Sequence, residues 1–217
     1  MKRAILIVTW SGTTHYCLNL LRTLEDYKEY PLIVAINDVE NCKDEKFLAY
    51  LNTHDIEVLP IEGNRWEMGA LTAITALTSY DEFILIQDTL EVRNPSIFKT
   101  MFDFEDRSVS FGPGWLCYLG KYRRQVLNQV MIPICLTKVD AFYQEVRFGA
   151  LYDIVANVVE GQSPVILFPE WGNDNPLNWT DDMFGRRNLV LDNPYLIKRK
   201  GIEWYGMGPF AASIAHI

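Results

Sequence analysis

Apolar runs alternate with segments of helical period through the first half of the chain. Residues 4–9 form a nearly continuous apolar run, which is typical of a strand covered on both faces. The elements that follow alternate between helix and strand, and are predicted at 16–24, 32–36, 45–51, 57–60, 66–78 and 82–86. This order is the pattern of a βαβ sheet. We therefore expect an α/β fold in which the strand over residues 4–9 is central.

The second half of the chain has a more mixed pattern. Strands are predicted at 133–136 and 165–168, with a long helix at 140–159 between them. Tryptophan, glycine, asparagine and proline crowd residues 171–179, which predicts an irregular loop over a pocket. Neither a repeat nor a linker interrupts the sequence, so we expect one domain over residues 1–217.

Composition narrows the class of protein. Hydrophobic residues make up 49% of the 217 residues and charged residues 22%, which indicates an ordinary globular protein. No apolar run approaches the roughly 20 residues that span a bilayer, so we expect no membrane span. The four cysteines are far apart and lack CxxC pairing, which predicts neither a zinc site nor a disulfide framework. A reducing cytoplasm fits these features best.

The net charge of −8 argues against a broad basic surface for nucleic acid, because such binding depends on neutralising phosphates. The charge does not exclude a local basic groove, for which the candidates are Lys121, Arg123 and Arg124 or residues 198–200. Solvated surface charge is the favoured interpretation of both clusters.

Polar residues stand directly after the clearest of the predicted strands, at 82–86. They are Gln87, Asp88 and Thr89. Ligands of open α/β sheets bind at the carboxyl ends of the strands. These residues therefore define a candidate site, and for Asp88 a role in binding is favoured over the alternative, which is capping of the following turn.

This layout resembles the GT-A glycosyltransferases, which have a Rossmann-like domain with a mostly parallel sheet, helices on both faces and a mixed C-terminal half. The resemblance implies that residues 1–111 bind the nucleotide sugar and that residues 112–217 bind the acceptor. It implies a pocket lip at Thr9, Trp10 and Ser11 and a base or ribose contact from Asn37 or Asp38. The remaining residues that it places near the sugar nucleotide or at the metal motif are Asn64, Arg65, Glu67, Gln87, Asp88 and Thr89.

The family holds Mn²⁺ or Mg²⁺ with an Asp-x-Asp motif, and this chain departs from that motif. Either Gln87 and Thr89 replace the two aspartates, or Asp88 is the first and Leu90 stands at the second position. The resemblance suggests His216 as a second ligand beside Asp88. A metal-free alternative would use cationic side chains to stabilise the diphosphate, with Lys121, Arg186 and Arg187 as candidates.

Inverting transfer needs a carboxylate to accept the proton of the attacking hydroxyl. The acidic residues beside the tryptophan-rich loop are the candidates, in the order Asp174, Glu170, Asp181 and Asp182. A retaining enzyme would not need this base. Glu67 has a structural interpretation as well, because carboxylates are favoured in the first turn of a helix.

The expected function is transfer of a sugar from a UDP- or GDP-sugar to a hydroxyl acceptor. The sequence does not distinguish between four acceptors, a polysaccharide, a protein side chain, a small metabolite and a hydroxylated DNA base. The net charge makes nucleic acid the least favoured of them. The alternatives are a non-catalytic nucleotide-sugar-binding or interaction protein and a sugar nucleotidylyltransferase. The nucleotidylyltransferase is disfavoured because residues 10–14 hold one glycine and no lysine. A dehydrogenase is disfavoured because no GxGxxG motif follows the first strand.

Overall fold

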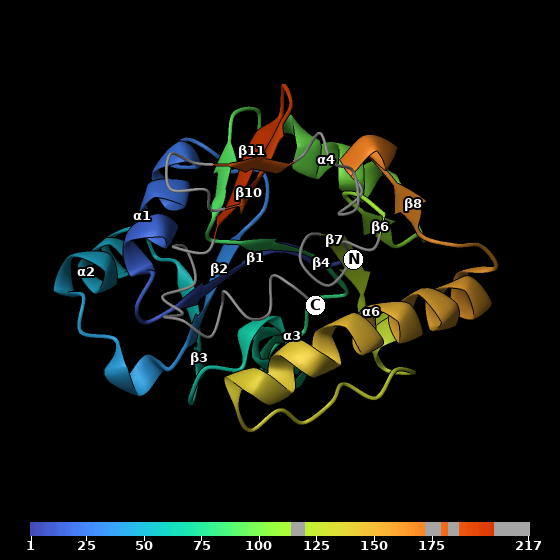
Figure 1. The fold of residues 1–217 in the computed structure, drawn as a ribbon, viewed down its shortest axis with the longest axis horizontal. Helices are drawn as coiled ribbons and strands as arrows, with labels where there is room; N and C mark the ends of the chain where they lie inside the picture. Colours follow the sequence, from blue (N-terminus) through green and yellow to red (C-terminus); the bar gives the residue numbers. More distant parts are fainter. Residues whose placement is uncertain (114–119, 172–178, 182–186, 202–217) are drawn as a thin grey trace.

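Two sheets organise the part of the chain that the computed structural model describes, residues 1–113, 120–171, 179–181 and 187–201. The strands of the larger sheet are β1 (Arg3–Trp10), β2 (Leu32–Asn37), β3 (Glu57–Ile61), β4 (Glu82–Gln87), β6 (Val109–Ser110), β7 (Gly120–Arg123) and β8 (Val165–Ile166). They are hydrogen-bonded in the order β3-β2-β1-β4-β7-β6-β8. β1 is thus an interior strand, as the sequence predicts (Figure 1).

β1 is parallel to both of its neighbours, β2 and β4. The register pairs Trp10 with Asn37 on one side and Val8 with Gln87 on the other. Because the three strands run in the same direction, their carboxyl ends meet at one edge of the sheet. This edge is where the polar residues of the candidate site follow the strands.

Helices cover both faces of the larger sheet (Figure 1). One face packs against α1 (Thr14–Thr23), α2 (Glu45–Thr53) and α4 (Ser96–Asp103), and the other packs against α3 (Trp66–Leu77) and α6 (Lys138–Glu160). The alternation of side chains along a strand divides the core between the two faces. In β1, for example, Ile5 and Ile7 pack on the α1 side, while Leu6 and Val8 pack on the α3 side.

The smaller sheet consists of β5 (Leu90–Val92), β9 (Trp179–Asp181), β10 (Arg187–Asp192) and β11 (Leu196–Gly201), in the order β5-β11-β10-β9. β5 begins three residues after the end of β4, so it joins the small sheet to the strand that Asp88 follows. A short helix, α5 (Arg124–Leu127), and two 3₁₀ turns, Val39–Asn41 and Pro169–Trp171, complete the described elements.

The predicted strand at 133–136 is wrong. This segment has no strand pairing, and Ile134 is 86% exposed and Leu136 73% exposed. The strand that pairs antiparallel with β4 is β7. Its apolar pattern is hidden in the sequence because two of its four residues are Lys121 and Arg123, which are buried.

The basic cluster at 121–124 is likewise neither a surface patch nor a groove. Lys121 Nζ lies 3.3 Å from a Glu82 carboxylate oxygen and donates to the Phe104 carbonyl at 2.8 Å. Burial lowers the pKa of Lys121 although Glu82 opposes the shift. Glu82 is the first residue of β4, whereas Asp88 follows its last, so the expectation that Lys121 stabilises a diphosphate is wrong. Arg124 instead donates to the carbonyls of Ile74 and Thr75 near the end of α3.

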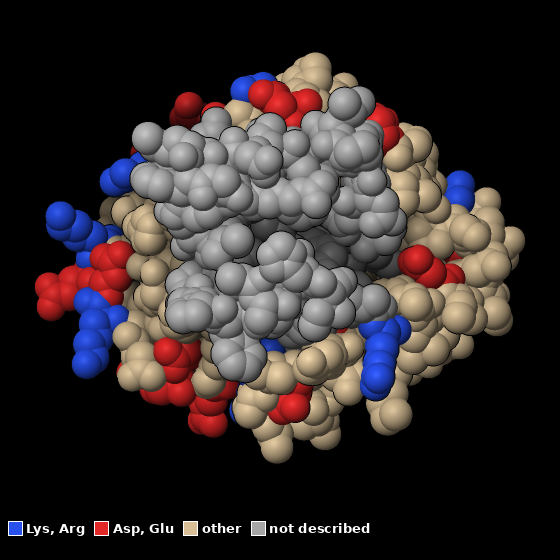
Figure 2. All heavy atoms as spheres, in the orientation of Figure 1, with Lys and Arg blue, Asp and Glu red and all other residues tan. Residues whose placement is uncertain are grey.

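Surface charge of both signs is interspersed among the described side chains on the face shown in Figure 2. Among the residues that the structure describes, no helix is both long and apolar enough to cross a membrane.

Candidate functional site

The ends of β1, β2 and β4 bring together the three polar segments that the sequence predicts. The Ser11 amide donates to the Asn37 carbonyl at 3.0 Å, which joins the segment after β1 to the end of β2. The Asp88 amide donates to the Val8 carbonyl at 3.0 Å, which joins the segment after β4 to β1. Asp38 and Asp88 therefore lie at the same edge of the sheet, on either side of the β1 end.

The first polar group at this edge is the α1-side cluster, which we define as Thr9, Thr13 and Asp88. Both hydroxyls donate to the same carboxylate oxygen of Asp88, Thr9 at 2.8 Å and Thr13 at 2.7 Å. Thr13 immediately precedes α1, so the carboxylate connects β4 and β1 to the start of that helix. Hydrogen bonds to an ionised acceptor are stronger than neutral ones, so this cluster holds the edge together.

Asp38 occupies a tight turn beside this cluster. Its φ of 58° is left-handed, a conformation that Asp and Asn adopt more readily than other non-glycine residues. The carboxylate accepts hydrogen bonds from Ser11 Oγ at 2.8 Å and Asn41 Nδ2 at 2.7 Å. Partial burial favours a higher pKa for Asp38, but the hydrogen bonds from Asn41 and Ser11 outweigh it and lower the pKa. The site therefore carries an ionised, partly exposed carboxylate at neutral pH.

The second polar group is the α3-side cluster, which we define as Asn37, Arg65, Trp66, Glu67 and Gln87. Asn37 is 1% exposed, and its amide is engaged with backbone groups. Its Nδ2 donates to the carbonyls of Thr9 and Trp66, each at 3.2 Å, and its Oδ1 accepts from the Arg65 amide at 2.9 Å. Of the two residues predicted to contact the base or ribose, Asp38 is thus the one whose side chain is accessible.

Glu67 has an unusual environment within the α3-side cluster. It is only 5% exposed, and its Oε1 accepts a hydrogen bond from Gln87 Nε2 at the end of β4. Its Oε2 is buried without a hydrogen-bond partner, as is Arg65 Nε. Trp66, between them, has a φ of 46°, which is strained for a bulky residue. Buried unpaired polar groups and backbone strain both concentrate at functional sites.

Close packing fixes α3 against the sheet at this point. A Cβ atom added to Gly69 would lie 2.9 Å from Ile61 Cγ2 and 3.1 Å from Asn37 Oδ1. Glycine at this position therefore permits the close approach that places Glu67 beside Gln87. The packing interpretation of Gly69 is the one that the geometry supports.

Sequence reasoning missed one cationic residue at this edge. Lys138 Nζ lies 5.3 Å from the Trp10 ring centroid and 5.6 Å from the Trp66 ring centroid, within the range of cation–π attraction. Burial lowers the pKa of Lys138. The helix was predicted from residue 140, so Lys138 fell outside it. The signal was the capping box of Thr137 and Asp140, which starts α6 at Lys138.

The predicted residues of the second half are only partly described. Glu170 is exposed in the 3₁₀ turn Pro169–Trp171. In the first half, the predicted residue Asn64 accepts a weak hydrogen bond from the Trp66 amide at 3.4 Å. The backbone of Asp181 ends β9. The Asp181 side chain and residues Asp174, Asp182, Arg186 and His216 lie outside the described part of the structure, as does the side chain of Arg187.

The described residues alone do not form a complete site for Mn²⁺ or Mg²⁺. Within residues 1–113, 120–171, 179–181 and 187–201, no three His, Cys, Asp or Glu side chains gather closely enough to hold a metal ion. One oxygen of Asp88 is engaged with two threonine hydroxyls. A hard cation prefers six or more oxygen ligands, so Asp88 would need ligands from outside this set.

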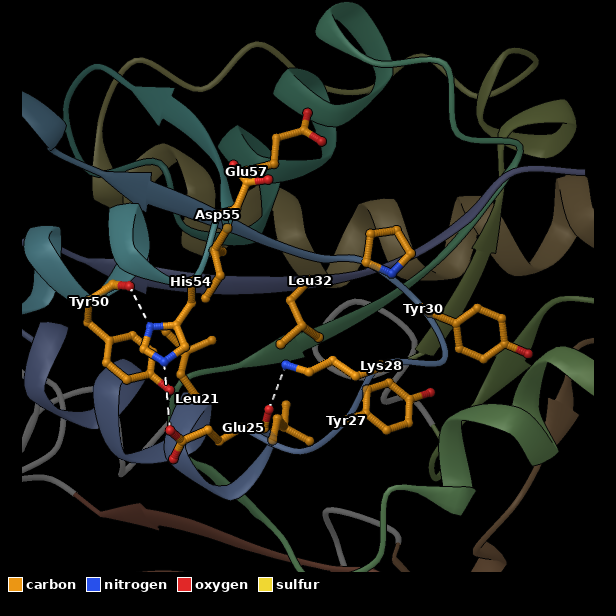
Figure 3. Close-up of a pocket in the computed structure, with 13 residues that line it drawn as sticks. Leu21, Glu25, Tyr27, Lys28, Tyr30, Leu32, Tyr50, His54, Asp55 and Glu57 are labelled. Carbon is orange, nitrogen blue, oxygen red and sulfur yellow. Dashed lines mark hydrogen bonds and ion pairs between the residues drawn. The ribbon is translucent and has the colours of Figure 1, made fainter.

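A cavity of about 720 Å³ lies at the other, amino-terminal edge of the sheet (Figure 3). We call it the amino-edge cavity, and its lining includes Glu25, Tyr27, Lys28, Tyr50, His54 and Glu57. The His54 ring stacks on Tyr50, and its Nε2 lies 3.7 Å from Glu25. None of the predicted site residues that the structure describes lines this cavity.

Comparison with known proteins identifies the fold. No protein-family model and no curated protein matches the sequence. The mannosyltransferase PcManGT from Pyrobaculum calidifontis, solved in complex with GDP-Man and Mn²⁺, matches the structure with a TM-score of 0.53 and 10% identity, over 78% of this chain and 55% of that one. The galactosyltransferase LgtC with donor and acceptor sugar analogues gives 0.41 at 10% identity, over 72% and 66%. An active-site mutant of LgtC gives 0.40 at 12% identity, over 50% and 45%.

The chain therefore has a GT-A-like fold. Its larger sheet, mostly parallel with helices on both faces, confirms the predicted fold class. The chain spans about half the length of the mannosyltransferase that it matches.

Proposed function

We propose that this protein is a glycosyltransferase that moves a sugar from a UDP- or GDP-sugar to a hydroxyl acceptor. One observation carries the proposal: on a GT-A-like fold, the ends of β1, β2 and β4 gather Asp38, Asp88 and the Glu67–Gln87 pair at one edge. The mannosyltransferase of similar fold was solved with a nucleotide sugar. Ligands of open α/β sheets bind at this edge.

The residues at the edge suit the parts of a nucleotide sugar. The Asp38 carboxylate is ionised and partly exposed, so it accepts a hydrogen bond from a ribose hydroxyl or a base N–H. The Trp10 and Trp66 rings offer aromatic faces. The ammonium group of Lys138 provides positive charge for the diphosphate, in the role that sequence reasoning assigned to other cations.

Transfer breaks the bond between the anomeric carbon and the diphosphate oxygen and forms a bond to the acceptor oxygen. The electron pair leaves with the diphosphate, and the acceptor hydroxyl gives up its proton. In an inverting mechanism a carboxylate takes that proton, and Asp174, Glu170 and Asp181 remain the proposed candidates. We also propose a cytoplasmic location, supported by Cys17, Cys42 and Cys135, which are free thiols.

A non-catalytic nucleotide-sugar-binding protein is the second candidate. The observation that favours it is the incomplete metal motif, because Asp88 is its single carboxylate and one of its oxygens is already bonded to Thr9 and Thr13. Such a protein would bind the donor without releasing nucleotide from it. Binding and turnover therefore separate the two candidates.

The test is a panel of UDP- and GDP-sugars, measured by thermal shift with and without Mn²⁺, followed by an assay of nucleotide release. A donor at one hundred times its Kd should add about 2.7 kcal/mol of stability, which raises Tm by about 5–10 °C. Asp38→Ala should weaken this shift. Glu25→Gln, in the amino-edge cavity, is the control and should leave it unchanged.

A panel in which no nucleotide or nucleotide sugar shifts Tm would contradict the proposal. Binding without nucleotide release, in the presence of Mn²⁺ and of an acceptor library, would favour the non-catalytic candidate instead.

A further inference from the structure

The buried carboxylate of Glu67 has half of its hydrogen-bonding capacity unused. Its Oε1 accepts from Gln87, but its Oε2 is buried and has no partner. A carboxylate that is 5% exposed loses hydration on folding, and an unsatisfied oxygen leaves that loss uncompensated. The protein therefore carries a destabilising group in the first turn of α3, beside the end of β4 and at the edge where a ligand is expected.

The surroundings of Glu67 hold this carboxylate in place. Gln87 fixes one oxygen, and the close packing of Gly69 against Ile61 and Asn37 fixes the helix that carries Glu67. Glu67 forms no ion pair with any residue of the described part of the chain. A pre-positioned carboxylate without an ion-pair partner matches a neutral donor group such as a hydroxyl better than it matches an anion.

We propose that Glu67 selects the sugar of the donor: its Oε2 accepts a hydrogen bond from a hydroxyl of a neutral hexose, while Gln87 positions the carboxylate. The same charge disfavours a donor whose sugar is itself a carboxylate, such as a hexuronic acid. This inference rests on the proposed function, because it assumes that the nucleotide sugar binds at this edge. It adds the chemical class of the sugar and the residue that recognises it.

The experiment compares sugar-free nucleoside diphosphates, neutral nucleotide hexoses and nucleotide hexuronates by titration calorimetry. Wild-type protein should bind the neutral donor more tightly than the diphosphate alone and at least about tenfold more tightly than the hexuronate. Glu67→Gln keeps the shape and the acceptor for Gln87. It should lose about tenfold to a hundredfold in affinity for the neutral donor, the amount expected for one hydrogen bond to a charged group.

Two further readouts separate recognition from a structural role. Affinity for UDP or GDP alone should stay within about twofold in Glu67→Gln, since the proposal places the changed atom against the sugar and not against the nucleotide. Its Tm should not fall and should rise by about 2–4 °C, because the substitution removes a buried charge with an unpaired oxygen. Glu67→Asp, which keeps the charge but shortens the side chain, should recover the discrimination against the hexuronate but not the full affinity.

Several outcomes would overturn the inference. Equal losses for the diphosphate and the neutral donor would show that Glu67 supports the fold rather than the sugar. Stabilisation of wild type, but not of Glu67→Gln, by Mn²⁺ alone would make Glu67 a metal ligand. If wild-type protein binds nucleoside diphosphates but shows no preference between the two sugars, this inference alone is wrong. If it binds no nucleotide at all, the proposed function is wrong as well.

Discussion

The α1-side and α3-side clusters lie at the ends of the same strands, on opposite faces of the sheet, and they differ in how completely their polar groups are paired. In the α1-side cluster, the Asp88 carboxylate accepts hydrogen bonds from two hydroxyls. One belongs to Thr9 in β1 and the other to Thr13 at the start of α1, so the carboxylate connects these two elements. In the α3-side cluster, Glu67 Oε2 and Arg65 Nε are buried without partners, and Trp66 is strained. We therefore propose that the first cluster joins structural elements and that the second binds the ligand.

The difference follows from the pleat of β4. Successive side chains of a strand point to opposite faces, so Gln87 contacts Glu67 on the α3 side while Asp88 contacts Thr9 and Thr13 on the α1 side. A motif of adjacent polar residues at a strand end therefore serves two different neighbourhoods. Asp88, which looks most like a ligand-binding residue in the sequence, has its hydrogen bonds more completely formed than Glu67 has.

The largest expected effect concerns Asn37, whose buried side chain forms three hydrogen bonds within or next to the α3-side cluster. Asn37→Ala should lower the free energy of unfolding by about 3 kcal/mol, because it leaves the Thr9 and Trp66 carbonyls and the Arg65 amide without their partner in a buried region. Chemical denaturation at neutral pH measures this loss. The substitution also removes the hydrogen bonds that hold the start of α3. Affinity for the neutral donor should therefore fall together with stability.

The matched control for Asn37 is its neighbour Asp38, replaced by Asn. A loss for Asn37→Ala no larger than the loss for Asp38→Asn would show that the buried amide does not hold the two strand ends and α3 together. The α3-side cluster would then lack its structural member, and the contrast between the clusters would weaken.

A smaller loss of stability is expected in the α1-side cluster. Asp88→Ala should lower the free energy of unfolding by about 2 kcal/mol, since the Thr9 and Thr13 hydroxyls lose a shared charged acceptor. Glu67→Gln should not lower it. Urea unfolding of the two variants side by side measures the difference directly, and a reversed order of stabilities would break the comparison.

Much of the fold was predictable because its first half follows simple periodicities. The strands at 32–36 and 82–86 match β2 and β4 to within one residue, because buried parallel strands read as continuous apolar runs. β7 was missed because ion pairs with Glu82, Asp106 and Glu160 allow Lys121 and Arg123 to be buried. Such pairing is a tertiary effect that hydrophobic periodicity does not reveal.

The sequence could predict at which edge of the sheet the site lies, but not which face of the sheet each side chain points to. Asn37, Asp38 and Asp88 could be assigned to strand ends, and the topology brings those ends together. The sequence cannot tell which oxygen of a carboxylate finds a partner, so it favoured binding for Asp88, which is satisfied, over binding for Glu67, which is not. Lys138 was missed because it contacts Trp10 and Trp66 from a helix far along the chain.

The smallest expected effect is the pH dependence that Asp38 contributes. Its pKa is lower in the folded protein than in the unfolded chain, where an aspartate titrates near about pH 4. The ionised form is thus favoured by folding, and its contribution is present above about pH 4 and lost as the pH falls through the lowered folded pKa. Asp38 is partly exposed, so the contribution should stay below about 1 kcal/mol.

Asp38→Asn isolates this contribution, because asparagine tolerates the same left-handed backbone. The difference in unfolding free energy between wild type and this variant should be constant from pH 7 to about pH 5 and shrink below about pH 4. Urea unfolding across that range measures it, with Glu25→Gln as a variant outside the site. A difference that does not change with pH would mean that Ser11 and Asn41 do not favour the ionised carboxylate. The proposed contact with the nucleotide would then rest on an aspartate that is ionised at neutral pH but is not held in place by Ser11 and Asn41.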